Sequence, residues 1–163
     1  MKIKVKLFDE ACTPHIIKKG DWIDLKSSAY VELEAPRIED DSVIFDRRLI
    51  SLGVAMQLPK GYEAIINARS STYTKFGIML WNSQGVIDNS YNGDSDEWNC
   101  TALALKKGVI KKGDRICQFR VQLSQKANLW QKIKWLFSSK IAFEYVPKLG
   151  NKNRKGFGST GYK

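Results

Sequence analysis

Alternation of charged and apolar residues over short stretches is the feature that most constrains this chain. Residues 2–7 alternate strictly, and the same pattern recurs over residues 31–34, 62–66 and 141–146. A period of two is typical of a β-strand with one face buried and the other in water. The chain is therefore expected to consist mainly of β-strands.

Continuous apolar stretches predict buried strands between the alternating ones. They occupy residues 43–45, 49–58, 78–81, 101–105 and 115–123. Turn signals fall between them, at residues 59–61, 92–93 and 112–114. Many short strands separated by turns predict an all-β, jelly-roll-like barrel. Because no linker interrupts the pattern, we expect residues 1–149 to form a single β-domain.

Residues 126–140 do not follow the strand pattern. Leu129, Ile133 and Phe137 recur at helical spacing, which predicts a short helix over about residues 128–137. The segment also opens the most basic part of the chain, because residues 126–163 hold nine Lys or Arg and one acid. The net charge of +10 indicates an anionic partner. Residues 150–163 are polar and Gly-rich, which predicts a flexible C-terminal arm.

Several classes of protein are excluded or disfavoured by the sequence. No apolar run approaches the roughly 18 residues of a membrane span, and the N-terminus has no signal-peptide core. Three widely spaced cysteines fit a reducing compartment better than a disulfide framework. The lone histidine, His15, argues against a zinc site or a two-histidine metal-hydrolase motif. We therefore expect a cytoplasmic protein without a membrane partner.

Three segments carry the donors that phosphate groups require, namely Arg or Lys, hydroxyl groups and glycine-freed backbone N–H groups. They are residues 69–72, residues 115–118, and residues 156–161 behind the basic run 152–155. Each pattern taken alone is also common without any ligand. Arg-Ser after a strand is frequent, and a Gly-rich tail is usually only a tail.

A fourth segment, residues 85–94, places Asp88 directly after an apolar strand and Tyr91 three residues later. This order suits a hairpin that presents one carboxylate and one aromatic ring to a pocket. It also suits an Asx-turn aspartate beside a tyrosine that only packs.

Taken in order, these segments resemble the five motifs of the trimeric dUTPase family, in the variants of Gram-positive bacteria and their phages. The matching residues are 21–25, 69–72, 85–93, 113–118 and 156–161. The resemblance covers about residues 2–161. It implies a jelly-roll-like β-clip fold and the hydrolysis of dUTP to dUMP and pyrophosphate. That reaction limits uracil in DNA and supplies dUMP for thymidylate synthesis. It further implies Mg²⁺ and a homotrimer whose active sites are each shared by three subunits.

The resemblance also assigns roles to individual residues. Asp88 activates the attacking water and contacts the deoxyribose, and Arg154 is the catalytic cation of the arm. Mg²⁺ is held by the substrate phosphates without a direct protein ligand, and Asp24 has an outer-shell role. The substrate-binding residues are expected to be Arg69, Ser70, Ser71, Asn82, Gly85, Val86, Ile87, Tyr91, Gln118, Lys152, Phe157, Gly158, Ser159 and Thr160.

The chain departs from the family pattern at several positions. The arm arginine usually lies five residues before the phenylalanine, where this chain has Lys152, whereas Arg154 lies three before Phe157. Ser71 replaces the usual glycine, and Trp22 replaces a small residue. Residues 126–140 form an insertion. It could cover an edge of the trimer, bind nucleic acid or a protein partner, or contact a membrane surface.

Two other functions compete with dUTP hydrolysis. A dCTP deaminase shares the fold, but the glutamate that deaminases carry in the strand after the third motif has no counterpart in residues 99–105. A non-catalytic basic β-domain fits the composition, but it does not explain why Asp88, Tyr91, Gln118 and Phe157 recur in family order.

Overall fold

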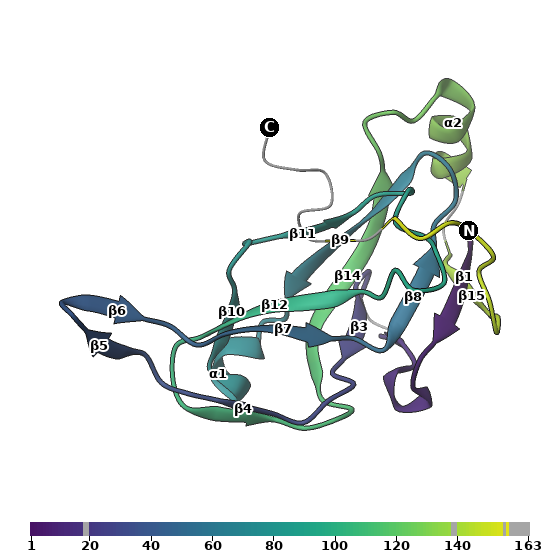
Figure 1. Cartoon of the computed structure of the whole chain (residues 1–163). Coiled ribbons are helices and arrows are strands. Elements are labelled where there is room, and N and C mark those ends of the chain that lie inside the picture. The colour runs from purple at the N-terminus through teal and green to yellow at the C-terminus, as the bar shows by residue number, and fades with distance from the viewer. Residues whose placement is uncertain (18–19, 138–139, 155, 157–163) are drawn as a thin grey trace.

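A five-stranded sheet with the strand order β11-β9-β14-β3-β2 forms the centre of the computed structural model (Figure 1). The structure describes residues 1–17, 20–137, 140–154 and 156. Two three-stranded sheets, β15-β1-β8 and β10-β12-β7, and two two-stranded sheets, β13-β4 and β5-β6, complete the described strands. All the strand pairs are antiparallel except β1 with β15.

The elements have the following bounds. The strands are β1 (Lys2–Leu7), β2 (His15–Ile16), β3 (Ile23–Lys26), β4 (Val31–Leu33), β5 (Arg37–Glu39), β6 (Ser42–Ile44), β7 (Arg47–Ser51), β8 (Val54–Gln57), β9 (Tyr62–Ala68), β10 (Ile78–Leu80), β11 (Gly85–Ile87), β12 (Asn99–Ala104), β13 (Gly108–Ile110), β14 (Arg115–Leu123) and β15 (Ala142–Tyr145). The helices are the 3₁₀ turn η1 (Glu10–Cys12), α1 (Thr72–Phe76) and α2 (Leu129–Phe137).

The core forms where the inward faces of the sheets meet. Ile3 and Val5 of β1 are fully buried while the alternating Lys2 and Lys4 are exposed, as the period of two predicts. Trp98 is also fully buried, and its ring meets that of Phe119 edge to face with centroids 5.1 Å apart. The prediction of an all-β jelly-roll-like domain with one short helix near residues 128–137 is confirmed.

One predicted buried strand is exposed. Residues 42–44 form β6, which pairs with β5 in a hairpin that extends away from the body of the molecule (Figure 1). Val43 is 56% exposed and its cross-strand partner Ile38 is 78% exposed. Asp40 and Asp41 have positive φ angles at the tip, as a two-residue hairpin turn requires. An apolar run of three residues was therefore insufficient to predict burial.

Helix α2 is anchored at its start by reciprocal side-chain contacts. Gln131 N donates to Asn128 Oδ1 at 3.0 Å, and Asn128 N donates to Gln131 Oε1 at 2.8 Å, which is a capping box. Trp135 holds the helix to β9, because its ring lies 5.7 Å from that of Tyr62. Among the described residues, no helix is long and apolar enough to span a membrane.

Candidate active site

The turn after β9 is tied to β14 by a buried hydroxyl. Thr72 is fully buried; its Oγ1 accepts from Arg69 N at 2.8 Å and donates to Ile116 O at 3.0 Å. These bonds satisfy buried polar groups and fix residues 69–72 against β14. The local sequence Arg-Ser-Ser-Thr thus sets the position of the arginine and the two serines.

Two arginines converge on one buried carboxylate, forming the arginine cluster of Asp24, Arg69 and Arg115. Asp24 is fully buried in β3; Arg69 Nε lies 2.8 Å from its Oδ1 and Arg115 Nη1 lies 3.1 Å from its Oδ2. The register of β14 with β3 shifts between Arg115 and Cys117, and such irregularities often re-aim side chains near active sites. The cluster therefore presents two guanidinium groups at the start of β14.

Three further predicted phosphate-binding residues lie near the arginine cluster. Ser70 is exposed, and Arg69 Nη1 lies 3.5 Å from Ser71 Oγ. Gln118 stands opposite Asp24 in the β14–β3 register and donates to Ala68 O at 3.1 Å. Side-chain amides, hydroxyls and guanidinium groups are the donors that a phosphate chain requires. Arg115 belongs to one of the segments predicted from the sequence to carry donors for phosphate groups, but no role in the site was predicted for it.

Asp88 lies directly after β11, and hydrogen bonds stabilise its ionised carboxylate form. Its Oδ1 accepts from Ser90 N at 2.7 Å and from Ser90 Oγ at 2.5 Å, and its Oδ2 accepts from Arg154 Nη1. Burial raises the pKa of the Asp88 carboxyl, but the hydrogen bonds from Ser90 and Arg154 outweigh it and hold that pKa below its usual range. The group is therefore ionised at neutral pH.

Tyr91 and Asn82 flank the strand that leads to Asp88. The Tyr91 hydroxyl donates to Glu97 O at 2.9 Å, and burial raises the pKa of Tyr91, so the ring stays neutral. Asn82 Oδ1 accepts from Thr101 Oγ1 at 2.5 Å. Gly85, Val86 and Ile87 make up β11, an edge strand of the five-stranded sheet. An edge strand leaves one row of backbone donors and acceptors open to a ligand.

The beginning of the C-terminal arm brings Arg154 onto Asp88. The Nη1 of Arg154 forms an ion pair with Asp88, and its backbone N donates to Asp96 at 2.9 and 3.0 Å. Lys152 is exposed and makes no hydrogen bond or ion pair with the described part of the chain. The predicted site residues Phe157, Gly158, Ser159 and Thr160 lie outside the described residues.

A cleft of about 640 Å³ contains Asp88 and Arg154, and we call it the Asp88 cleft. Such a volume is typical of small-molecule sites. Its wall also includes residues that sequence reasoning did not assign to the site: Lys60, Gly61, Glu63, Asn89, Ser90, Ser124, Gln125, Lys126, Asn128 and Gln131. The inserted segment thus borders the same cleft as Asp88, which its position in the sequence alone did not reveal.

The arginine cluster and the Asp88 cleft lie at opposite ends of β9. Ile87 pairs with Ala64 and Gly85 pairs with Ile66, so Asp88 falls at the level of Glu63. Arg69 follows the other end of β9, six residues further on, which corresponds to about 20 Å along a strand. A water-activating carboxylate must lie within hydrogen-bond reach of the water that it deprotonates. One chain therefore does not bring the two halves of the predicted site together.

The donor chemistry of the site fits a phosphate-held Mg²⁺. Among the described residues, no group of three or more His, Cys, Asp or Glu could hold a metal ion. Asp24, the predicted outer-shell residue, has both carboxylate oxygens on arginines. Cations and neutral donors at the arginine cluster suit the phosphate oxygens, which are themselves the oxygen ligands that Mg²⁺ prefers.

Comparisons with known proteins show similarity to dUTPases. A family model described as dUTPase matches residues 24–135. The SPbeta prophage-derived deoxyuridine 5′-triphosphate nucleotidohydrolase YosS of Bacillus subtilis is 43% identical over the full length of both chains. The dUTPase of Streptococcus mutans superposes with a TM-score of 0.64 at 23% identity, over 77% of this chain and 98% of that one. The Staphylococcus bacteriophage 80alpha dUTPase superposes with a TM-score of 0.61 at 20% identity, over 78% and 93%.

Fold and site together define a jelly-roll β-protein with a carboxylate cleft and a separate arginine cluster. More narrowly, the chain belongs to the dUTPase family. The resemblance deduced from five ordered motifs is confirmed, and so is the expectation of Gram-positive and phage relatives.

Proposed function

We propose that this protein hydrolyses dUTP to dUMP and pyrophosphate. The observation that carries the proposal is the Asp88 carboxylate, which is hydrogen-bonded by Ser90 and paired with Arg154 in a cleft of about 640 Å³. Family membership supplies the substrate class, because the relatives at full or nearly full length are named deoxyuridine 5′-triphosphate nucleotidohydrolases.

Asp88 acts as the general base. The oxygen of the attacking water bonds to the α-phosphorus as the bond between that phosphorus and the α–β bridging oxygen breaks, and a proton of the water passes to the Asp88 carboxylate. Pyrophosphate leaves with the bridging oxygen, and Arg154 stabilises the charge that develops on the phosphate oxygens. Proton transfer by a positioned side chain contributes about 10²–10⁴ in rate.

The base and sugar are recognised by the hairpin around Asp88. The open edge of β11 offers backbone donors and acceptors to uracil, and Asn82 assists from the adjoining turn. Cytosine is rejected because its exocyclic amino group would leave the site's polar groups unpaired. Tyr91 lies against the deoxyribose and leaves no room for a 2′-hydroxyl, and Phe157 covers the uracil.

The phosphate chain is bound by Ser70, Ser71, Gln118 and the arginine cluster. Mg²⁺, held by the phosphate oxygens, neutralises part of their charge. The phage phi11 dUTPase of Staphylococcus aureus coordinates a structural Mg(II) ion. Ser159 and Thr160 of the arm reach the terminal phosphate, with Lys152 nearby.

The active form is a homotrimer with sites formed between subunits. The separation of about 20 Å along β9 between Asp88 and Arg69 supports this proposal. The Asp88 cleft of one chain therefore requires the phosphate-binding residues of another chain. Residues 1–149 form the β-domain, and residues 150–163 form the arm that closes over the substrate.

Substitution Asp24→Asn distinguishes arginine positioning from an outer-shell metal role. We expect kcat/KM for dUTP to fall by about 10²-fold at every Mg²⁺ concentration, because Arg69 and Arg115 lose the carboxylate that orients them. The protein should also unfold at a lower urea concentration, since the Arg69 and Arg115 cations would then face a buried group that carries no charge. The measurement is a Mg²⁺ titration of dUTP turnover, and recovery at high Mg²⁺ would instead assign Asp24 to the metal.

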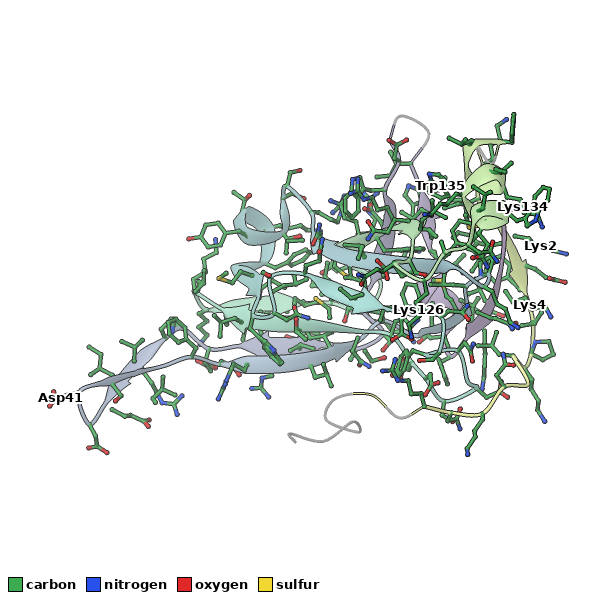
Figure 2. All side chains as sticks on the ribbon, turned by 90° about the horizontal axis from the view of Figure 1, so that it is seen from above. Lys2, Lys4, Asp41, Lys126, Lys134 and Trp135 are labelled. Carbon is green, nitrogen blue, oxygen red and sulfur yellow. The ribbon has the colours of Figure 1, made fainter. Side chains whose placement is uncertain are left out.

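Deletion of residues 127–139 tests the insertion. Trp135 packs on Tyr62, whereas Trp130 and Phe137 are 73% and 84% exposed. Lys134 and Trp135 lie on α2, far from the hairpin tip at Asp41 (Figure 2). We expect the deletion to dissociate the trimer, as measured by light scattering, because the helix covers a subunit edge. An intact, active trimer that has lost single-stranded DNA binding would instead make the segment a nucleic-acid surface.

A further inference from the structure

A second cleft, of about 330 Å³, adjoins the Asp88 cleft. The walls of the two clefts share Lys60, in the turn between β8 and β9, and Asn89, which follows Asp88. The second cleft extends to Lys4 on β1, and the Asp88 cleft extends to Lys126 at the start of the insertion. Together the two clefts form one continuous groove, which we call the lysine groove.

Three lysines of the lysine groove have no acidic partner. Lys4, Lys60 and Lys126 are exposed, and none of them forms an ion pair within the described part of the chain. The acids in the walls are each bonded to another group: Glu144 to Lys2, Glu63 to Gln122 and Asp88 to Ser90. The lysine groove therefore holds three cations whose charge is not neutralised locally, which suits a polyanion.

Two asparagine side chains lie between these lysines. Asn89 Nδ2 donates to Leu58 O at 2.5 Å, and Asn92 Nδ2 donates to Asn89 O at 2.6 Å. These bonds fix both side chains, whose Oδ1 atoms accept no hydrogen bond from the described residues. Amide oxygens can accept from the N–H groups of base edges, which are accessible in single strands. Cations combined with such acceptors fit single-stranded nucleic acid better than a free polyphosphate.

We propose that the lysine groove binds single-stranded nucleic acid, with its lysines on the phosphates and its asparagines on base edges. None of the residues that carry this proposal belongs to the C-terminal arm. The groove lysines also account for part of the net charge of +10 that lies outside residues 150–163. Figure 2 shows Lys4 and Lys126 toward one end of the molecule and Asp41 at the opposite end.

Fluorescence anisotropy with a labelled oligothymidylate of about 16 nucleotides tests the site in the full-length, assembled protein. The probe contains no uracil. We expect the logarithm of the affinity to fall against the logarithm of the salt concentration with a slope of about −2, from three neutralised phosphates of a single strand. An oligothymidylate of about 4 nucleotides should bind at least about tenfold more weakly, because it fills less of the groove. Absence of binding would overturn the proposal. Equal affinity for both lengths, with displacement by tripolyphosphate at the same phosphate concentration, would show a phosphate site only and would overturn it as well.

The variants Lys4→Ala and Lys107→Ala form a matched pair. Both lysines are exposed and make no ion pair with described residues, but Lys107 lies next to β13 and outside both clefts. We expect Lys4→Ala to reduce the steepness of the salt slope by about 0.7, which weakens binding by about five- to tenfold near 50 mM salt. Lys107→Ala should change neither quantity. Equal effects of the two variants would reduce the binding to net charge and would overturn the lysine groove.

Competition with dUTP tests where the strand lies. This measurement rests on the proposed hydrolysis of dUTP, whereas the anisotropy does not. Because the lysine groove includes the Asp88 cleft, the oligothymidylate should raise KM for dUTP and leave kcat unchanged. Lys4→Ala should weaken this inhibition while leaving turnover without oligonucleotide unchanged, since Lys4 lies outside the Asp88 cleft. Binding without inhibition would place the strand elsewhere and contradict the proposal, and absence of dUTP hydrolysis would overturn only the proposed function.

Discussion

Substitution Asp88→Asn is expected to lower kcat for dUTP by about 10²- to 10⁴-fold, the contribution typical of a general base. The amide has nearly the same shape as the carboxylate and retains one acceptor oxygen, but it cannot take the water proton. The substrate should still bind, because the substitution leaves unchanged both the backbone edge of β11 and the residues proposed to bind the phosphate chain. The measurements are pyrophosphate release for kcat and calorimetry with a non-hydrolysable dUTP analogue for binding.

The Asp88→Asn variant also distinguishes catalysis from binding to a partner. If the chain also binds nucleic acid or a protein through residues 126–140, that binding should survive Asp88→Asn. A variant that keeps full hydrolysis would show that Asp88 is not the base. The Asn89→Ala variant is less informative as a control, because Asn89 lines the same cleft; Asp41→Asn is the better matched change.

Substitution Arg154→Ala is expected to lower kcat by about 10³-fold or more, since an arginine acting on transferring phosphates supplies about 10³–10⁵ in related chemistry. Lys152→Ala should have a much smaller effect. Lys152 is exposed and unpaired within the described residues, whereas Arg154 is held by both Asp96 and Asp88. The measurement is steady-state turnover of both variants, and the reverse order would move the catalytic role to Lys152.

Arg154→Ala should also change the pH dependence. Burial raises the pKa of Asp88, and hydrogen bonds from Ser90 and Arg154 lower it below its usual range. Removal of the guanidinium therefore raises that pKa. Asp88 then becomes protonated at a higher pH on acidification, and the acid limb of kcat/KM shifts upward in pH. An unshifted limb would mean that the ion pair does not persist in the working enzyme.

Local patterns were sufficient to predict most of the β-structure. The alternation in β1 and in β9 reports which face is buried, and helical spacing was enough to place α2. The prediction that residues 43–45 are buried was wrong, because a short apolar run does not reveal whether its hairpin packs on the body of the molecule or extends from it. That outcome depends on tertiary contacts, which no periodicity encodes.

The chemistry of the site could be predicted only in part. The order of the motifs identified Asp88, Arg154 and Gln118 as candidates. The hydrogen bond from Arg154 N to Asp96 was not predictable, since a carboxylate in a turn usually makes a local Asx contact, whereas these two residues lie 58 positions apart along the chain. That the insertion lies beside the Asp88 cleft could also not be predicted without the fold, because its position follows from the pairing of β14 with β9.

Hydrolysis of dUTP by the unmodified protein is the central claim, and one assay tests it directly. Pyrophosphate and ammonia are measured side by side with dUTP, dTTP, UTP and dCTP as substrates in the presence of Mg²⁺. We expect rapid pyrophosphate release from dUTP, little from dTTP, UTP and dCTP, and no ammonia. Ammonia from dCTP would instead identify a deaminase, and no release from any nucleotide would leave a non-catalytic binding protein.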